Sequence, residues 1–183
     1  MVIALDAPDT AANIARHSPS GKVPALRHGE LTVWDSLAIC EYLAELFPEA
    51  KLWPEQRAAR ALARSVSAEM HSSFMALRQH CGMNIRARKP GVGLQAPGVA
   101  QDIARVKALW TQCLEQHGAG GPFLFGAFSI ADAMYAPVVT RFVTYGVELD
   151  ARLSAYRDAV LALPAMQAWA KAGAAEPPVA RYE

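Results

Sequence analysis

The sequence predicts a small α/β unit followed by a larger, all-helical unit. Two short apolar runs flank Gly29-Glu30 and indicate a β-hairpin. In the later two thirds of the chain, apolar residues recur every three or four positions, as on the buried faces of packed helices. Between these regions, Pro48 and Pro54 bracket a short stretch typical of a linker. We therefore expect domains at residues 1–48 and 56–183, joined by a linker at 49–55.

The composition is that of a globular protein with a substantial core. Of the 183 residues, 52% are hydrophobic and 19% are charged, and the formal net charge is +1. The densest basic stretch is the short segment Arg86-Ala87-Arg88-Lys89. Such a charge balance argues against a nucleic-acid partner and against polybasic attachment to a membrane.

Cysteine and histidine spacing gives no sign of a metal site. Cys40, Cys81 and Cys113 are far apart and form no CxxC pair, and the five histidines show no ligand spacing. Each cysteine lies in a predicted helix, where a buried free thiol is the expected state. Free thiols suit a reducing compartment, and neither a signal peptide nor an apolar run of about 20 residues is present. We expect a cytoplasmic protein without a metal.

Local signals define the elements of the first unit. The apolar run at Val2–Leu5 predicts a strand, and residues 9–16 predict a short helix capped by Asp9 or Thr10. The hairpin strands are expected at Ala25–His28 and Leu31–Trp34, with a type II′ turn. Helical spacing then runs from Ser36 to Phe47, and Pro48 follows its end.

Apolar stripes define the helices of the second unit. The first stripe predicts one continuous helix, a second follows a Gly/Pro-rich loop at residues 90–98, and a third precedes Pro164, which suits the first position of a last helix. The members of the first stripe are Leu62, Val66, Met70, Phe74, Leu77 and Cys81.

Two dipeptides in the first unit have the chemistry of a peptide-binding site. A cis Val23-Pro24 bond would turn the Val23 amide and carbonyl outwards, where they could pair with an extended peptide. Asp35-Ser36 opens a helix. These two residues could be ordinary caps, or the helix N-terminus and hydroxyl could bind a carboxylate while Asp35 attracts an ammonium group.

Residues 18–26 and 34–47 resemble the second half of the thioredoxin-like domain of bacterial cytosolic glutathione transferases. The resemblance implies that Pro24 is cis and that Val23 pairs with the cysteinyl backbone of glutathione. It also implies that Asp35 and Ser36 hold the γ-glutamyl head. Lys22 would reach the glycyl end, although a solvated loop lysine is an alternative at this position.

The resemblance also implies a fold and an activity. The fold would be an incomplete thioredoxin-like domain followed by a helical bundle, with the first strand and first helix of the family absent. Because that segment supplies the hydroxyl or thiol that activates glutathione, no catalytic residue is assigned. We expect the full-length form to conjugate the glutathione thiolate to small electrophiles, with glutathione as co-substrate, no metal and a homodimeric assembly. The alternatives are a maleylacetoacetate-type isomerase and a non-catalytic binding or dimerisation module.

Two further motifs lie in the helical unit. Ser129 and Asp132 have the spacing of a capping box, similar to one in this family, and we expect them to be structural. His71, Ser72 and Phe74 lie on the helix that faces the cleft in relatives. They are candidates for the second-substrate pocket, and core or dimer contacts are the alternative.

Overall fold

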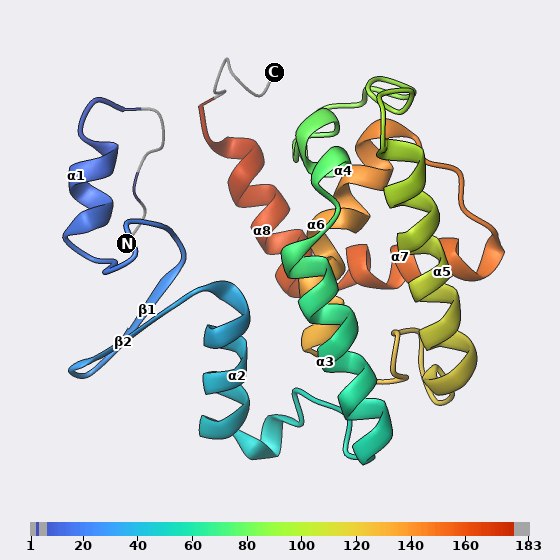
Figure 1. Ribbon diagram of the computed structural model, residues 1–183, viewed down its shortest axis with the longest axis horizontal. Coiled ribbons are helices and arrows are strands. Elements are labelled where there is room, and N and C mark those ends of the chain that lie inside the picture. Colours follow the sequence, from blue (N-terminus) through green and yellow to red (C-terminus); the bar gives the residue numbers. More distant parts are fainter. Residues whose placement is uncertain (1–2, 4–6, 178–183) are drawn as a thin grey trace. The chain divides into compact units, whose positions relative to one another are not determined.

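The computed structural model describes residue 3 and residues 7–177, and its chain divides into two compact units at Lys51 and Leu52 (Figure 1). Each unit has its own helices, and the first unit also has the two strands. Most of the strand predicted at Val2–Leu5 lies outside the described residues, and Ile3, which is described, is in neither a helix nor a strand.

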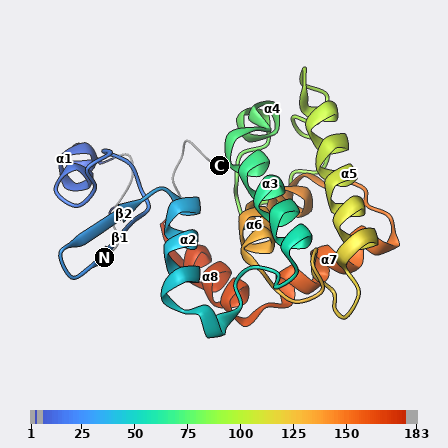
Figure 2. The same cartoon turned by 60° about the horizontal axis from the view of Figure 1, so that its bottom comes forward.

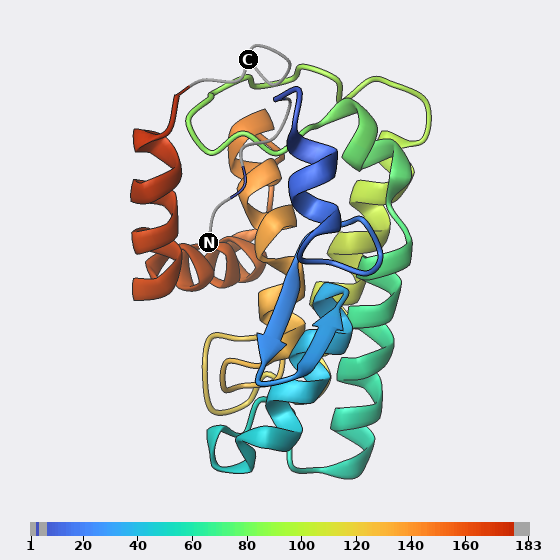
Figure 3. The ribbon, with the colours of Figure 1, turned by 90° about the vertical axis from the view of Figure 1, so that its left-hand side faces the viewer.

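The first unit consists of a hairpin and short helices (Figure 3). Its elements are α1 (Thr10–Ala15), β1 (Ala25–His28), β2 (Leu31–Trp34), α2 (Ser36–Leu46) and a 3₁₀ turn η1 (Pro48–Ala50). β1 and β2 are antiparallel, and Leu26 is opposite Val33. Only Gly29 of the two turn residues has a positive φ, at 60°. This matches the predicted II′ turn, because a I′ turn requires a positive φ at both positions.

Among the described residues of the second unit, the regular secondary structure is helical apart from short bridges near residue 125. Its helices are α3 (Arg57–Ser72), α4 (Met75–His80), α5 (Val99–His117), α6 (Ile130–Tyr145), α7 (Ala151–Ala162) and α8 (Pro164–Ala175), and α6 packs against α3 and α7 (Figures 1 and 2). At the centre, the fully buried Trp110 contacts three other rings. Its ring centroid lies 5.8, 5.3 and 4.9 Å from those of Tyr135, Phe142 and Tyr156. The predicted fold class, a small α/β unit and a helical bundle, is confirmed.

The helix expected to run continuously through Phe74 is in fact broken there, so that prediction was wrong. α3 ends at Ser72, and Phe74 adopts a left-handed conformation with φ 61° before α4 begins. Phe74, Leu77 and Cys81 are nevertheless buried, so the apolar stripe continues across the break. The periodicity therefore identified the buried face correctly but did not reveal the break.

Side chains from other turns satisfy the polar groups that the break exposes. The Arg78 guanidinium donates to the carbonyls of Met70, His71 and Ser73 at the end of α3. At the start of α4, Asp102 of α5 accepts a 2.9 Å hydrogen bond from the Leu77 N–H. These groups lack partners within a regular helix, so their satisfaction stabilises two short helices in place of one long one.

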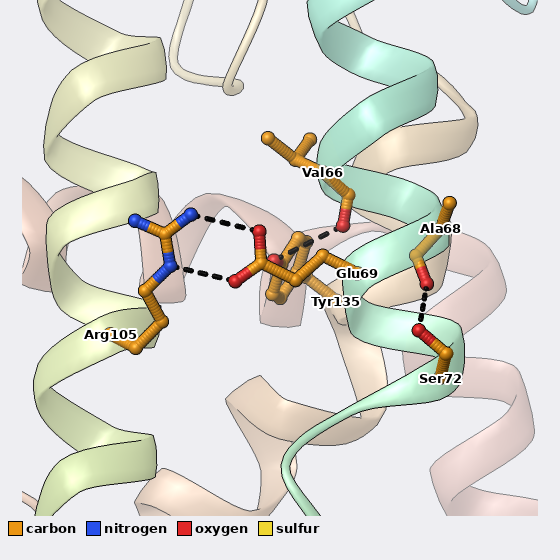
Figure 4. A network of polar contacts seen from close by, with 6 residues as sticks. All are labelled: Val66, Ala68, Glu69, Ser72, Arg105 and Tyr135. Carbon is orange, nitrogen blue, oxygen red and sulfur yellow. Dashed lines mark hydrogen bonds and ion pairs between the residues drawn. The ribbon is translucent and has the colours of Figure 1, made fainter.

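An ion pair joins α3 to α5 (Figure 4). Arg105 Nε and Nη2 donate to the two carboxylate oxygens of Glu69 at 2.7 and 2.9 Å. These hydrogen bonds lower the pKa of Glu69 below its usual value of 4.5. A carboxyl with a lowered folded-state pKa stabilises the fold above its unfolded pKa, and this contribution is lost as the pH falls.

Glu69→Gln should therefore lower the free energy of unfolding by about 0.5–1 kcal/mol at neutral pH, because both partners are partly exposed. Urea unfolding at several pH values measures this effect. The difference from the parent chain should shrink towards zero below about pH 4, where Glu69 is protonated in the unfolded chain. A difference that stayed constant between neutral and acidic pH would contradict an electrostatic origin.

Candidate functional site

The Val23–Pro24 segment presents an open backbone edge just before β1. The Val23–Pro24 peptide bond is cis, as the resemblance implies, and 53% of Val23 is exposed. Neither the Val23 N–H nor its carbonyl takes part in a hydrogen bond with another described residue. A free donor and acceptor on an exposed residue can pair with the backbone of an extended peptide.

The turn before this segment is fixed by local hydrogen bonds. The Ser18 side chain is buried and its Oγ lies 3.0 Å from Ser20 Oγ. The Ser18 carbonyl accepts from the Gly21 N–H at 3.1 Å, and Gly21 has the positive φ (65°) that glycine tolerates best. Lys22 follows with an exposed side chain. The turn therefore positions Lys22 and Val23 without using the Val23 backbone groups.

Asp35 is the N-cap of α2 and has an unusual backbone conformation. Its Oδ1 accepts from the N–H groups of Leu37 and Ala38 at 2.9 and 3.3 Å. Its φ and ψ are 75° and 131°, a region that non-glycine residues rarely occupy. Such a residue costs on the order of 1–3 kcal/mol, and residues of this kind cluster at functional sites. Asp35 is thus a helix cap, and its backbone strain is of the kind found at functional sites.

Because Asp35 caps α2, few backbone N–H groups at the start of this helix are available to bind an anion. The N–H groups of Leu37 and Ala38 are bonded to Asp35, and that of Ile39 donates to the Asp35 carbonyl. Ser36 is half-buried, and neither its N–H nor its Oγ donates to another described residue. A carboxylate at this helix end would thus be bound by Ser36 rather than by a full turn of free N–H groups.

A hollow of about 680 Å³ lies beside the hairpin, within the first unit. Val23 and Pro24 line it, together with side chains that the sequence did not single out, including Arg16, His17 and Arg27. Arg16 and His17 lie in the turn that follows α1 and Arg27 lies on β1, and no local spacing pattern connects the turn with the strand. Lys22, Asp35 and Ser36 do not line this hollow.

Ser129 and Asp132 form a buried capping box at the start of α6. Asp132 Oδ2 accepts from the Ser129 N–H and Oγ at 2.8 and 3.0 Å, and Oδ1 accepts from the Leu124 N–H at 3.0 Å. Burial raises the pKa of Asp132, although the bonded donors oppose the shift. The carboxylate thus joins the loop before α6 to the helix.

The three candidates for a second-substrate pocket have different environments. His71 and Ser72 are exposed, and Ser72 Oγ donates to the Ala68 carbonyl of its own helix at 2.9 Å (Figure 4). Phe74 is only 5% exposed. Its burial within the helical unit supports the alternative of a core contact, whereas His71 and Ser72 remain accessible candidates.

All three cysteines are free thiols. Cys81 and Cys113 are buried and Cys40 is half-buried. Burial raises the pKa of each thiol, that of Cys113 to about 12. Among the residues that the structure describes, no group of three or more His, Cys, Asp or Glu side chains is placed to hold a metal ion, and no helix is long and apolar enough to cross a membrane.

The hairpin with its cis-prolyl segment, the capped α2 and the following helical bundle define a thioredoxin-like domain joined to an all-α domain. Family models agree with this assignment. The model for the glutathione S-transferase N-terminal domain matches residues 2–46, and that for the C-terminal domain matches residues 96–172. Maleylacetoacetate isomerase from Rattus norvegicus is 31% identical over 153 residues, which cover 82% of this chain and 68% of that protein. The chain belongs to the glutathione S-transferase family.

Two further similar proteins are also named as glutathione transferases or homologues of them. Glutathione S-transferase 1 from Dianthus caryophyllus is 29% identical over 134 residues, or 72% of this chain. The match spans 60% of the length of the Dianthus protein. Among solved structures, a glutathione transferase homologue from Burkholderia with bound glutathione superposes with a TM-score of 0.66 and 27% identity. That alignment covers 88% of this chain and 78% of the Burkholderia chain.

Proposed function

We propose that this chain binds glutathione and contributes the glutathione-recognition site of an enzyme that conjugates the glutathione thiolate to small electrophiles. The proposal rests mainly on the exposed Val23 backbone, which is free to pair with an extended peptide. In this proposal Val23 and Pro24 receive the cysteinyl backbone, and Lys22 attracts the glycyl carboxylate. Asp35 and Ser36 hold the ammonium and carboxylate of the γ-glutamyl head. Likeness to a Burkholderia homologue that was solved with glutathione supports the choice of peptide.

Glutathione transfer requires that the thiol of the bound tripeptide be held in a defined orientation. Two fixed ends and a backbone-paired centre would orient the tripeptide so that its thiol projects in one direction. A thiolate so placed attacks an electrophilic carbon, and the leaving group departs with the electron pair of the broken bond. His71 and Ser72 are proposed contacts for the electrophile. We further propose a cytoplasmic homodimer, in keeping with the resemblance.

An isomerase is the second candidate, and a specific observation favours it. Two relatives carry the name of this isomerase: maleylacetoacetate isomerase from Rattus norvegicus, and a probable maleylacetoacetate isomerase from Vibrio cholerae that is 44% identical over 64 residues. An isomerase uses the thiolate only transiently and regenerates glutathione. Glutathione consumption during turnover therefore distinguishes the two activities, because only the transferase uses one glutathione for each product formed.

Ser36→Ala should weaken glutathione binding by the chain about five- to tenfold, because it removes a hydroxyl that bonds to a charged carboxylate. Isothermal titration with glutathione measures this change. Ser65→Ala is the matched control, since the Ser65 hydroxyl is exposed and donates to the Ala61 carbonyl of its own helix. Unchanged affinity in the Ser36 variant, or an equal loss in the control, would contradict the assigned site.

A further inference from the structure

A groove on the surface of the helical unit combines an apolar floor with two opposite charges. It has a volume of about 440 Å³ and is bounded by α5, the loop before α5 and the loop between α6 and α7. Its larger apolar side chains are Leu94, Ile103 and Val147. Its lining also contains one cation, Lys107, and one anion, Glu148. We call this region the α5 groove.

The two charges of the α5 groove are available to a ligand. Neither Lys107 nor Glu148 is in an ion pair or a side-chain hydrogen bond with another residue that the structure describes. Glu148 is exposed and Lys107 is half-buried. A partly buried charge interacts more strongly with a counter-ion than a fully solvated one does, because less water surrounds the pair. A ligand with a carboxylate and an ammonium group would supply a partner for each side chain.

The loop between α6 and α7 runs along α5 (Figures 1 and 2). It begins after Tyr145, whose carbonyl accepts a 2.9 Å hydrogen bond from the Gly91 N–H in the loop before α5. Just beyond its other end, Arg152 Nη1 donates to Glu115 Oε1 near the end of α5 at 3.3 Å. The loop therefore passes from the first turn of α5 towards its last.

This course places both charges in one part of the α5 groove. Glu148 lies near the middle of the path between Tyr145 and Arg152, and Lys107 lies near the middle of α5. Leu94 precedes α5 and therefore lies towards the opposite end. The groove thus suits a ligand whose two charges are close together and whose apolar part extends away from them.

The walls of the α5 groove are fixed by contacts within the chain. The Val147 N–H donates to the Phe142 carbonyl of α6 at 2.9 Å. Gly146 has a φ of 67°, and a Cβ added there would lie 3.0 Å from Pro90 Cβ, so the two loops touch. The groove is formed before any ligand arrives, which reduces the ordering cost of binding.

We propose that the α5 groove binds a free α-amino acid with a large apolar side chain. The ligand carboxylate pairs with Lys107 and the ligand ammonium group pairs with Glu148. An α-amino acid carries both charges next to one carbon atom, from which its side chain extends onto Leu94, Ile103 and Val147. The site is separate from the glutathione site, and its occupation requires neither glutathione nor turnover.

L-Leucine is the probe, and the δ-methyl signals of the isoleucine-labelled full chain are the readout in heteronuclear NMR. Titration should shift the Ile103 signal, assigned with Ile103→Val. The dissociation constant should be on the order of 1 mM, because exposed charge pairs bind weakly. The signal of the buried Ile130 should stay in place, which shows that the bundle remains folded. An Ile103 signal that stays in place up to about 20 mM leucine would overturn the proposal.

Two analogues of leucine separate the two charge contacts. L-Leucinamide lacks the carboxylate and N-acetyl-L-leucine lacks the ammonium group, and each should bind the parent chain about three- to fivefold more weakly than leucine. Lys107→Gln should bind leucine and leucinamide equally, and Glu148→Gln should bind leucine and N-acetylleucine equally. Lys171→Gln, at an exposed position on α8, is the matched control and should keep the parent preference. Equal binding of leucine and both analogues by the parent chain would contradict the charge contacts.

The apolar contact is tested by a smaller ligand and by a larger side chain in the groove. L-Serine carries the same two charges without the apolar group and should bind at least about fivefold more weakly than leucine. Ala104→Leu should weaken leucine binding about tenfold, because Ala104 lines the groove and the larger side chain fills it. Full affinity for serine, or full affinity of the Ala104 variant for leucine, would contradict the site.

Two other outcomes would also overturn the proposal. Leucine has the same α-amino acid head as the γ-glutamyl end of glutathione, so competition by saturating glutathione would show that leucine binds at the glutathione site. An Ile103 signal that shifts with protein concentration alone would show that a second copy of the chain covers the groove. The proposed function survives either result, because it depends on residues of the first unit.

Discussion

Asp132→Ala is expected to lower the free energy of unfolding by about 3–5 kcal/mol. Asp132 is fully buried and accepts three hydrogen bonds, from the backbone N–H groups of Leu124 and Ser129 and from the Ser129 hydroxyl. Alanine leaves two buried N–H groups without an acceptor, and each unsatisfied group costs about 1–3 kcal/mol. Urea unfolding followed by far-ultraviolet circular dichroism measures the loss.

Asp150→Ala provides the comparison. Asp150 is the N-cap of α7, whereas Asp132 is the third helical residue of α6; Asp150 is exposed and accepts one backbone hydrogen bond, from the Leu153 N–H at 2.8 Å. Its loss should cost about 1 kcal/mol, the usual value for an exposed cap. If both substitutions lowered the free energy of unfolding equally, this result would contradict the prediction that burial makes the Asp132 hydrogen bonds more important for stability.

Asp35→Ala is expected to reduce the affinity for glutathione by roughly 10- to 100-fold, the worth of a hydrogen bond between charged groups. The same change removes the cap from Leu37 and Ala38 and places alanine at a positive φ, so it should also destabilise the first unit. Isothermal titration measures the affinity, and unfolding measures the stability.

Asp35→Asn separates the two effects. Asparagine retains a capping oxygen and tolerates a positive φ, but it carries no charge. If Asp35 attracts the ammonium group of glutathione, the asparagine variant should be nearly as stable as the parent and should still lose most of the affinity. Full affinity in a stable asparagine variant would assign Asp35 to capping alone.

The sequence predicts those features of the fold that are determined by residues close together in the chain. The hairpin follows from two apolar runs around Gly29, and the start of α6 follows from the spacing of Ser129 and Asp132. The helix end at Ser72 could not be predicted in the same way. It depends on Arg78 reaching back to carbonyls of α3 and on Asp102, which lies 25 positions beyond Leu77 in the chain.

In the candidate site, too, some features follow from the local sequence and others depend on residues that are distant in the chain. Local sequence marked Val23-Pro24 and Asp35-Ser36, but it gave no sign of the backbone strain at Asp35. The basic side chains around the hollow beside Val23 come from two parts of the first unit, the turn after α1 and the strand β1. Only the folded chain brings such residues together, so composition and periodicity contain no signal for them.

The protonated thiols of this chain have a practical consequence for assays of transfer. Electrophiles that accept the glutathione thiolate also alkylate protein thiolates, and an enzyme with a reactive cysteine inactivates itself during the measurement. Here burial keeps Cys81 and Cys113 protonated, and the half-buried Cys40 also has a raised pKa. At neutral pH the raised pKa values lower the thiolate fraction of these cysteines, so a control without glutathione should show little consumption of the electrophile.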